Sequence, residues 1–261
     1  MGYIKKRGEE AAESAMQENI DASKALLKFK SGSTHTLVIP HFDDPKDAPY
    51  VSYDAHSVYQ VFYTTPCLKD GNTKDMYDLA VDVLWKEAKA AEAEGDEDKY
   101  EKLKDQAVAL MPSERFLVGF FSMETGQPVI VDVTKNQAEV IIGAMKKYKT
   151  QAQTFRFELW KTGQKRDTKV GLDPILDPMS EKDQKRFDEL KGKSFDFDLF
   201  EKCLYIKPEE EQLEDLHKFG FDLSKIGKEL PNKDDKKDES KQEDAPPVDS
   251  KEEPEKDELG F

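Results

Sequence analysis

The stretch Thr154-Phe155-Arg156-Phe157-Glu158-Leu159-Trp160-Lys161 alternates between apolar side chains and larger polar or aromatic ones. Successive side chains of a strand point to opposite faces of its sheet. One face of this stretch therefore carries two phenylalanines and a leucine, and the other carries Arg156, Glu158 and Trp160. The pattern predicts a strand that packs on a core with its first face and leaves a tryptophan beside charged groups on its second.

Further strands are predicted on both sides of this stretch by runs of β-branched and aromatic residues with turn residues between them. The predicted strands cover residues 34–39, 58–64, 115–122, 128–133 and 165–172. Residues 26–30 precede a Ser-Gly-Ser turn, so we expect them to pair with residues 34–39 as a hairpin. The chain is therefore rich in short strands.

Helices are predicted at three places. Thr134 and Gln137 form a capping box, and the helix after them carries one apolar stripe, which consists of Ala138, Ile141, Ile142, Met145 and Tyr148. Residues 72–110 show helical spacing on both sides of Gly95 and hold six Lys and eleven Asp or Glu, so we interpret them as an acidic helical hairpin inserted among the strands. Beyond residue 174, helices are expected after Ser180 and from Pro208 to about Gly220.

These elements predict an α+β fold. Its best match is an OB-fold-like, partly open β-barrel with an inserted helical hairpin, C-terminal helices and a disordered acidic tail. Another α+β topology is also compatible with the pattern. We expect a basic and helical arm over residues 1–25, an OB-like core over 26–175 with its insertion at 72–110, a helical segment over 176–230, and the tail over 231–261.

The acidic tail ends in an unusual way. It holds twelve Asp or Glu and six Lys and contributes −6 to the net charge of −15, and such a composition predicts disorder. Its last residues are apolar, so we predict a peptide that docks on a partner protein: the terminal Phe fills an apolar pocket and the acids steer the tail toward basic surfaces. The predicted docking residues are Asp257, Glu258, Leu259, Gly260 and Phe261. The alternative is a solubilising tail whose last residue is accidental.

Positive charge gathers in residues 143–171, which hold eight Lys or Arg and two Asp or Glu in an otherwise acidic protein. Aromatic side chains lie among these cations, and a ring beside cations suits the stacking of an unpaired base with neutralisation of its phosphate. The predicted surface for single-stranded nucleic acid consists of Tyr59, Tyr63, Lys69, Arg115, Lys146, Lys147, Tyr148, Lys149, Arg156, Trp160, Lys161, Lys165, Arg166 and Lys169. The alternative is that Trp160 covers the core and the lysines form an ordinary solvated surface.

Motifs of enzymes and cofactor proteins are absent. The chain has no P-loop, no GxSxG and no GxGxxG, so we disfavour an enzyme and name no catalytic residue. Cys67 and Cys203 lie outside any CxxC motif, which favours a reducing, cytoplasmic setting. His56 and Cys67 offer two zinc ligands where a structural zinc takes four, so we expect no metal and no cofactor. The chain has no apolar run of membrane-spanning length and no secretory signal, so we expect no membrane partner.

The layout resembles the T4-type phage single-stranded DNA-binding (helix-destabilising) proteins over residues 1–175 and the tail. The start Lys5-Lys6-Arg7 is similar to that family's N-terminal arm, and residues 27–40 are similar to the segment that leads into its OB barrel. Thr65-Pro66-Cys67 lies where the family begins a subdomain that holds zinc with three cysteines and a histidine. This chain keeps only Cys67 there, so metal binding is not carried over. The ending Asp257 to Phe261 is closer to the tails of bacterial single-stranded DNA-binding proteins.

The resemblance implies a sequence-nonspecific protein that coats single-stranded DNA during phage replication and recombination in the bacterial cytoplasm. It implies cooperative self-association through Lys5, Lys6 and Arg7, and recruitment of replication and recombination proteins by the tail. A second hypothesis is an acidic adaptor or inhibitor that binds a protein and no nucleic acid. A third, ranked last, is an enzyme with an unrecognised carboxylate metal site.

Overall fold

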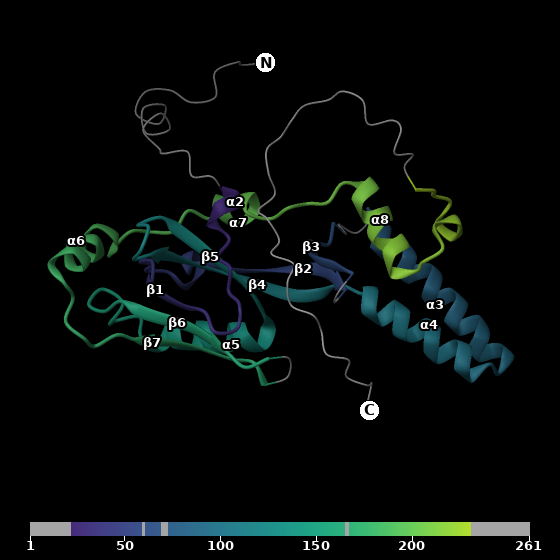
Figure 1. The fold of residues 1–261 in the computed structure, drawn as a ribbon, viewed down its shortest axis with the longest axis horizontal. Coiled ribbons are helices and arrows are strands. Elements are labelled where there is room, and N and C mark those ends of the chain that lie inside the picture. The colour runs from purple at the N-terminus through teal and green to yellow at the C-terminus, as the bar shows by residue number, and fades with distance from the viewer. Residues whose placement is uncertain (1–21, 59–60, 69–72, 165–166, 231–261) are drawn as a thin grey trace, which may run out of the picture.

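The computed structural model describes residues 22–58, 61–68, 73–164 and 167–230. In these ranges the strands form one curled antiparallel sheet, a half-barrel, with helices packed on it and beyond one end of it (Figure 1). The α+β class predicted from the sequence is confirmed. The strands are β1 (Thr34–Val38), β2 (Tyr50–Val58), β3 (Phe62–Pro66), β4 (Ser113–Ser122), β5 (Pro128–Thr134), β6 (Phe157–Thr162) and β7 (Lys169–Pro174). The α-helices are α2 (Ala22–Ala25), α3 (Met76–Glu94), α4 (Glu97–Leu110), α5 (Lys135–Lys147), α6 (Glu181–Leu190), α7 (Asp198–Lys202) and α8 (Glu209–Phe219), with short 3₁₀ turns η1 (Pro45–Asp47) and η3 (Leu223–Ile226).

Strand β4 organises the sheet, whose order is β3-β2-β4-β1-β6-β7 with β5 also paired to β4. One edge of β4 pairs with β5, and the other edge pairs first with β2, as in Tyr50↔Val118, and then with β1, as in Leu37↔Ser122. A strand that serves three partners must bend, because β1 and β2 diverge from the same edge. β1 and β5 therefore lie on opposite edges of β4, and β5 has a partner strand only on its β4 side within the described sheet.

The first core lies between α5 and the face of the sheet that the helix covers. Phe157 and Leu159 of β6 are fully buried there, as the alternating stretch predicts. Helix α5 contributes Ala138, Ile141 and Met145, all buried, and its capping box is present: the Thr134 N–H donates to Gln137 Oε1 at 3.4 Å. The apolar side chains of α5 and of β6, which the sequence patterns predict, therefore pack against each other in one core.

The opposite face of β4 and β5 packs against α6 and α7. Phe187 of α6 and Phe200 of α7 join Leu117 and Ile130 in a second core. Phe195 lies directly on Gly119 of β4, where an added Cβ would come within 2.6 Å of the Phe195 ring. Glycine at this point lets the C-terminal segment approach the sheet backbone closely.

The third core lies outside the half-barrel, between the α3–α4 hairpin and the end of the β2–β3 ribbon. Tyr77 of α3 and Leu110 of α4 are fully buried in it, and α8 adds Leu213 and Leu216 from the C-terminal segment. Figure 1 shows α8 lying along α3. The helical hairpin and α8, far apart in the sequence, thus form one packed unit.

Two strand predictions are wrong. Residues 26–30 do not form a hairpin with β1, because both edges of β1 are taken by β4 and β6; Leu26 instead forms an isolated bridge with Ile130. The single strand predicted over residues 58–64 is divided between β2 and β3, and the Val61 N–H donates to the Val58 carbonyl at 3.0 Å in the turn between them. Within the described ranges, no helix is both long enough and apolar enough to cross a membrane.

Candidate nucleic-acid interface

The fold divides the predicted cluster of cations between the two ends of β6. Tyr148 follows α5 and packs on Phe157 at the start of β6, with ring centroids 5.8 Å apart. Lys161 lies at the other end of the strand, where Thr162 pairs with Lys169. The lysines of α5 and its C-terminal end therefore lie at one end of the strand, and those of the β6–β7 hairpin lie at the other.

At the α5 end, the cations are engaged with neighbouring groups of the protein. The Lys147 ammonium lies 4.8 Å from the centroid of the Tyr148 ring, so this half-buried ring is a packing contact on both sides. Lys149 donates to the backbone carbonyl of Asp43 at 3.0 Å and lies over Phe42. Lys146 is exposed and has no ion pair within the described residues. This end of β6 presents few groups that are ready to receive a phosphate.

At the hairpin end, the charge of Arg115, on another strand, acts on Lys161. Lys161 is half-buried, with its ammonium 5.3 Å from the centroid of Phe29. Burial, and next the nearby Arg115 guanidinium, lower the pKa of Lys161, and the Asp132 carboxylate opposes the shift. This end of the sheet therefore concentrates positive charge in a partly desolvated place.

Arg115 is held in position by a small network across three strands. Its Nε donates to Asp132 Oδ1 at 2.8 Å, and the Tyr53 hydroxyl donates to Asp132 Oδ2 at 3.1 Å. Burial and the Asp132 charge raise the pKa of Tyr53, so its proton stays in place to make this bond. One carboxylate thus faces two cations, Arg115 directly and Lys161 nearby.

Trp160 points to the opposite face of β6 from Lys161. Its indole lies on Gly171 of β7, where an added Cβ would be 2.4 Å from the ring, and its Nε1–H donates to Asp173 Oδ2 at 2.7 Å. Arg156 precedes β6 and approaches Asp183 of α6 at 3.9 Å. A carboxylate, that of Asp173, is therefore the polar partner of this indole.

Tyr63 of β3 is 77% exposed, which leaves its ring open for stacking. It lies on the edge strand of the sheet, on the side of the helical hairpin. The remaining predicted site residues lie outside the described residues; they are Lys5, Lys6, Arg7, Tyr59, Lys69, Lys165, Arg166, Asp257, Glu258, Leu259, Gly260 and Phe261.

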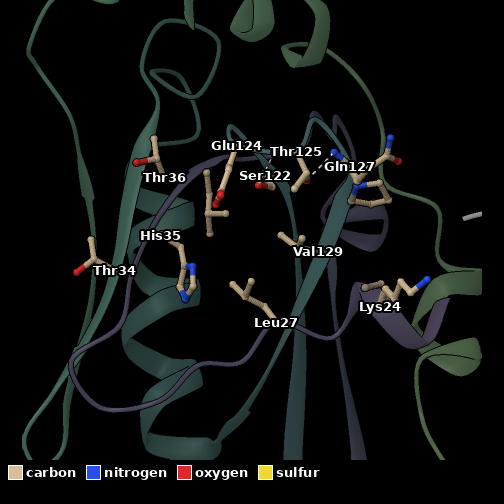
Figure 2. A pocket seen from close by; sticks show the side chains of 13 residues that line it. Lys24, Leu27, Thr34, His35, Thr36, Ser122, Glu124, Thr125, Gln127 and Val129 are labelled. Atoms are coloured by element: carbon tan, nitrogen blue, oxygen red, sulfur yellow. Dashed lines mark hydrogen bonds between the residues drawn. The ribbon is translucent and has the colours of Figure 1, made fainter. Parts of the chain in front are cut away.

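A pocket of about 780 Å³ lies between β1 and the β4–β5 hairpin. Figure 2 shows Ser122, Thr125 and Gln127 on one side of it and Thr34 and His35 on the other. The buried Nε2 of His35 has no hydrogen-bond partner in the described structure. The pocket shares no residue with the predicted surface, and the sequence did not indicate it because its walls come from distant segments.

A second cluster of polar residues lies where the β2–β3 ribbon meets the helical hairpin. It consists of His56, Cys67, Asp75 and Asp78, which lie close enough together to hold a metal ion. Burial opposes charge on His56, but the nearby Asp75 carboxylate and the Leu110 carbonyl, which lies 2.7 Å from Nδ1, raise the pKa of the imidazole. Burial likewise opposes charge on Asp75, but His56 and the backbone N–H of Asp78 hold the pKa of that carboxyl below its usual value.

Of these four residues, only His56 and Cys67 were considered as metal ligands on the sequence alone, and both aspartates were missed. Their signal was present: Asp75 begins α3 as its N-cap, and Asp78 lies three residues later on the buried side of that helix.

A comparison of the chain with known protein families gives no match, and a comparison with curated proteins gives none either.

Proposed function

We propose that the protein binds single-stranded DNA without sequence preference and coats it during phage replication and recombination. In this proposal the curled sheet is an OB-type, partly open barrel, and the strand passes over the hairpin end of β6. The observation that carries the proposal is that the half-buried Lys161 ammonium at this end is close enough to Arg115 and Asp132 for their charges to act on it, while Arg115 is bonded to Asp132. Burial and then the Arg115 charge lower the pKa of Lys161, and a phosphate placed there would offset the repulsion by Arg115.

Aromatic side chains supply the second half of the proposed interaction. Tyr63 is open to solvent on the edge strand, and one face of Trp160 rests on Gly171 while its ring remains half-exposed. Stacking of a base on such a ring contributes about 1–3 kcal/mol and tolerates any base. Trp160 lies on the opposite face of β6 from Lys161, and Tyr63 lies on β3, so the proposed DNA strand has to reach both faces of the sheet to use these rings as well as the cations.

The net charge of −15 is compatible with this proposal because charge is segregated. An acidic tail of −6 can compete with DNA for the basic surface, and such competition is screened beyond about 8 Å at physiological salt. The proposal assigns recruitment of replication and recombination proteins to Asp257–Phe261 and self-association along the strand to Lys5, Lys6 and Arg7.

Fluorescence anisotropy of labelled oligo-dT at low and moderate salt tests the proposal, with the matched duplex as control. We expect tight, salt-sensitive binding that prefers the single strand. Absence of binding at low salt would refute the proposal and favour the acidic adaptor. Deletion of residues 257–261 should leave DNA binding intact or stronger and abolish capture of partner proteins; loss of DNA binding would contradict the role given to the tail.

A further inference from the structure

The cluster of His56, Cys67, Asp75 and Asp78 joins two parts of the fold. His56 lies on β2 and Cys67 follows β3, whereas both aspartates belong to the start of α3. One nitrogen, one sulfur and two carboxylate oxygens, one from each residue, all lie within 4.8 Å of one another. Such a spacing is within reach of a single ion.

His56 is oriented as a ligand by its own hydrogen bond. The side chain is completely buried, and Nδ1 lies 2.7 Å from the carbonyl oxygen of Leu110 at the end of α4. A carbonyl only accepts, so Nδ1 carries a proton and Nε2 is the atom that faces the cluster. A backbone carbonyl holds metal-binding histidines in the same way.

Nε2 of His56 has no hydrogen-bond partner within the described residues. Asp75 Oδ2 lies 3.3 Å away, but the two atoms are not aligned as a hydrogen bond. A buried polar atom without a partner is costly and calls for an explanation such as an ion. Because this nitrogen points toward two carboxylates and a thiol, an ion at the centre of the cluster would satisfy it.

The two carboxylates are almost as deeply buried as the imidazole, at 6% exposure for Asp75 and 5% for Asp78. Asp75 uses Oδ1 to cap α3, by accepting from the Asp78 N–H at 2.9 Å, and turns Oδ2 toward His56. Asp78 Oδ2 accepts from the Cys67 thiol at 3.6 Å, and a thiol is a weak donor. Two buried carboxylates at one point favour a cation between them.

We propose that His56 Nε2, Cys67 Sγ, Asp75 Oδ2 and Asp78 Oδ2 bind one divalent transition-metal ion of the zinc type. Tetrahedral coordination at the usual zinc bond lengths places a nitrogen and an oxygen about 3.3 Å apart, and a sulfur and an oxygen about 3.5 Å apart. The corresponding distances are 3.3 Å for His56 to Asp75 and 3.6 Å for Cys67 to Asp78. Two of the six donor pairs therefore already have the spacing of a zinc site, and the remaining pairs, all within 4.8 Å, would close around the ion.

This donor set differs from the three cysteines and one histidine of the family that the sequence resembles. Only one thiolate is present, and two of the four donors are oxygens. The site is therefore a harder set of ligands, in the sense of hard and soft donors, than a thiolate-rich zinc site. The ion would tie the β2–β3 ribbon to the start of α3. Binding to the folded state alone would raise the thermal stability of the full chain.

Cobalt(II) is the probe, because its absorption reports thiolate ligation. The full-length protein, freed of metal with a chelator, is titrated with CoCl₂. We expect saturation at one equivalent, with a sulfur-to-cobalt charge-transfer band. Cys67→Ser should lose that band, and the matched control Cys203→Ser should keep it, because Cys203 is buried in another core and donates to the Phe200 carbonyl. No saturable binding, or a band that survives in Cys67→Ser, would overturn the proposal.

Two further measurements keep the proposal falsifiable if Cys67→Ser folds poorly. Asp78→Asn, with folding checked by circular dichroism, should weaken cobalt binding by at least about tenfold. In the unmutated protein, one equivalent of Zn²⁺ should slow the labelling of Cys67 by a thiol reagent and raise the unfolding temperature. Unchanged labelling, or unchanged cobalt affinity in Asp78→Asn, would contradict the site. None of these outcomes depends on DNA binding.

Discussion

Replacing Lys161 with Gln is the sharpest test of where single-stranded DNA is proposed to lie. Lys161 and Lys149 belong to one cationic stretch of sequence, but Lys161 lies beside Arg115 at the hairpin end of β6 and Lys149 contacts Asp43 and Phe42 at the other end. Lys149→Gln is therefore a matched control that removes the same charge from the same stretch. If the strand passes over the hairpin end, only the first substitution removes a phosphate contact.

The magnitude follows from counterion release. Each phosphate neutralised on a single strand contributes a slope of about −0.7 to the logarithm of affinity against the logarithm of salt concentration. Loss of one contact therefore lowers affinity about fivefold at 0.1 M salt and about 25-fold at 0.01 M. Because burial and Arg115 lower the pKa of Lys161, affinity should also fall as pH rises through that lowered value, before ordinary lysines lose their protons.

The assay is anisotropy of labelled oligo-dT at four or more salt concentrations for the unmutated protein, Lys161→Gln and Lys149→Gln, with folding of each checked by circular dichroism. We expect the slope of Lys161→Gln to be shallower by about 0.7 and that of Lys149→Gln to be unchanged. Equal changes in both variants, or no change in Lys161→Gln, would refute the placement of the strand at the hairpin end.

The remaining predictions concern two buried side chains, Tyr77 and Cys203, and the contact of Trp160 with Gly171. Tyr77→Phe removes the 2.8 Å bond to the buried Asp215 carboxylate and should lower the free energy of unfolding by about 1.5–3 kcal/mol in urea; a loss below about 0.5 kcal/mol would contradict the role of this bond. Gly171→Ala forces the indole of Trp160 to move and should cost about 1–3 kcal/mol with a shift of tryptophan fluorescence; unchanged stability and emission would show that the indole does not rest there. Burial raises the pKa of Cys203 to about 11, so this thiol should react with thiol reagents at about pH 8 only after unfolding, and fast labelling of the folded protein would count against its burial.

The sequence predicts elements that neighbours along the chain determine. The capping box at Thr134 and the alternation through Phe157 depend on a few adjacent residues, and both are confirmed. Strand β2 is unpredicted apart from its last residue, Val58, because its side chains serve three different cores: Tyr50 packs on the first, Val51 on the second and Val58 on the third. A strand that serves several cores shows no single apolar face.

Nearness in the sequence was a poor guide to the candidate sites. Lys149 and Lys161 are twelve residues apart but lie at opposite ends of β6, because the chain runs the length of the strand between them. Asp75 and Asp78 read as two of many acids in a charged hairpin. Their approach to His56 depends on how that hairpin packs against β2, which no local pattern encodes.

The packing of α8 on the helical hairpin has a consequence for the order in which the chain is made. Leu110 leaves the ribosome about 100 residues before the start of α8 at Glu209, which corresponds to about 5–20 s at typical rates of synthesis. During that time the apolar side of α3 that later contacts Leu213 and Leu216 has no cover from α8. A nascent chain arrested within this interval would expose the apolar surface of α3 that α8 later buries. We expect the protein to engage chaperones at this stage.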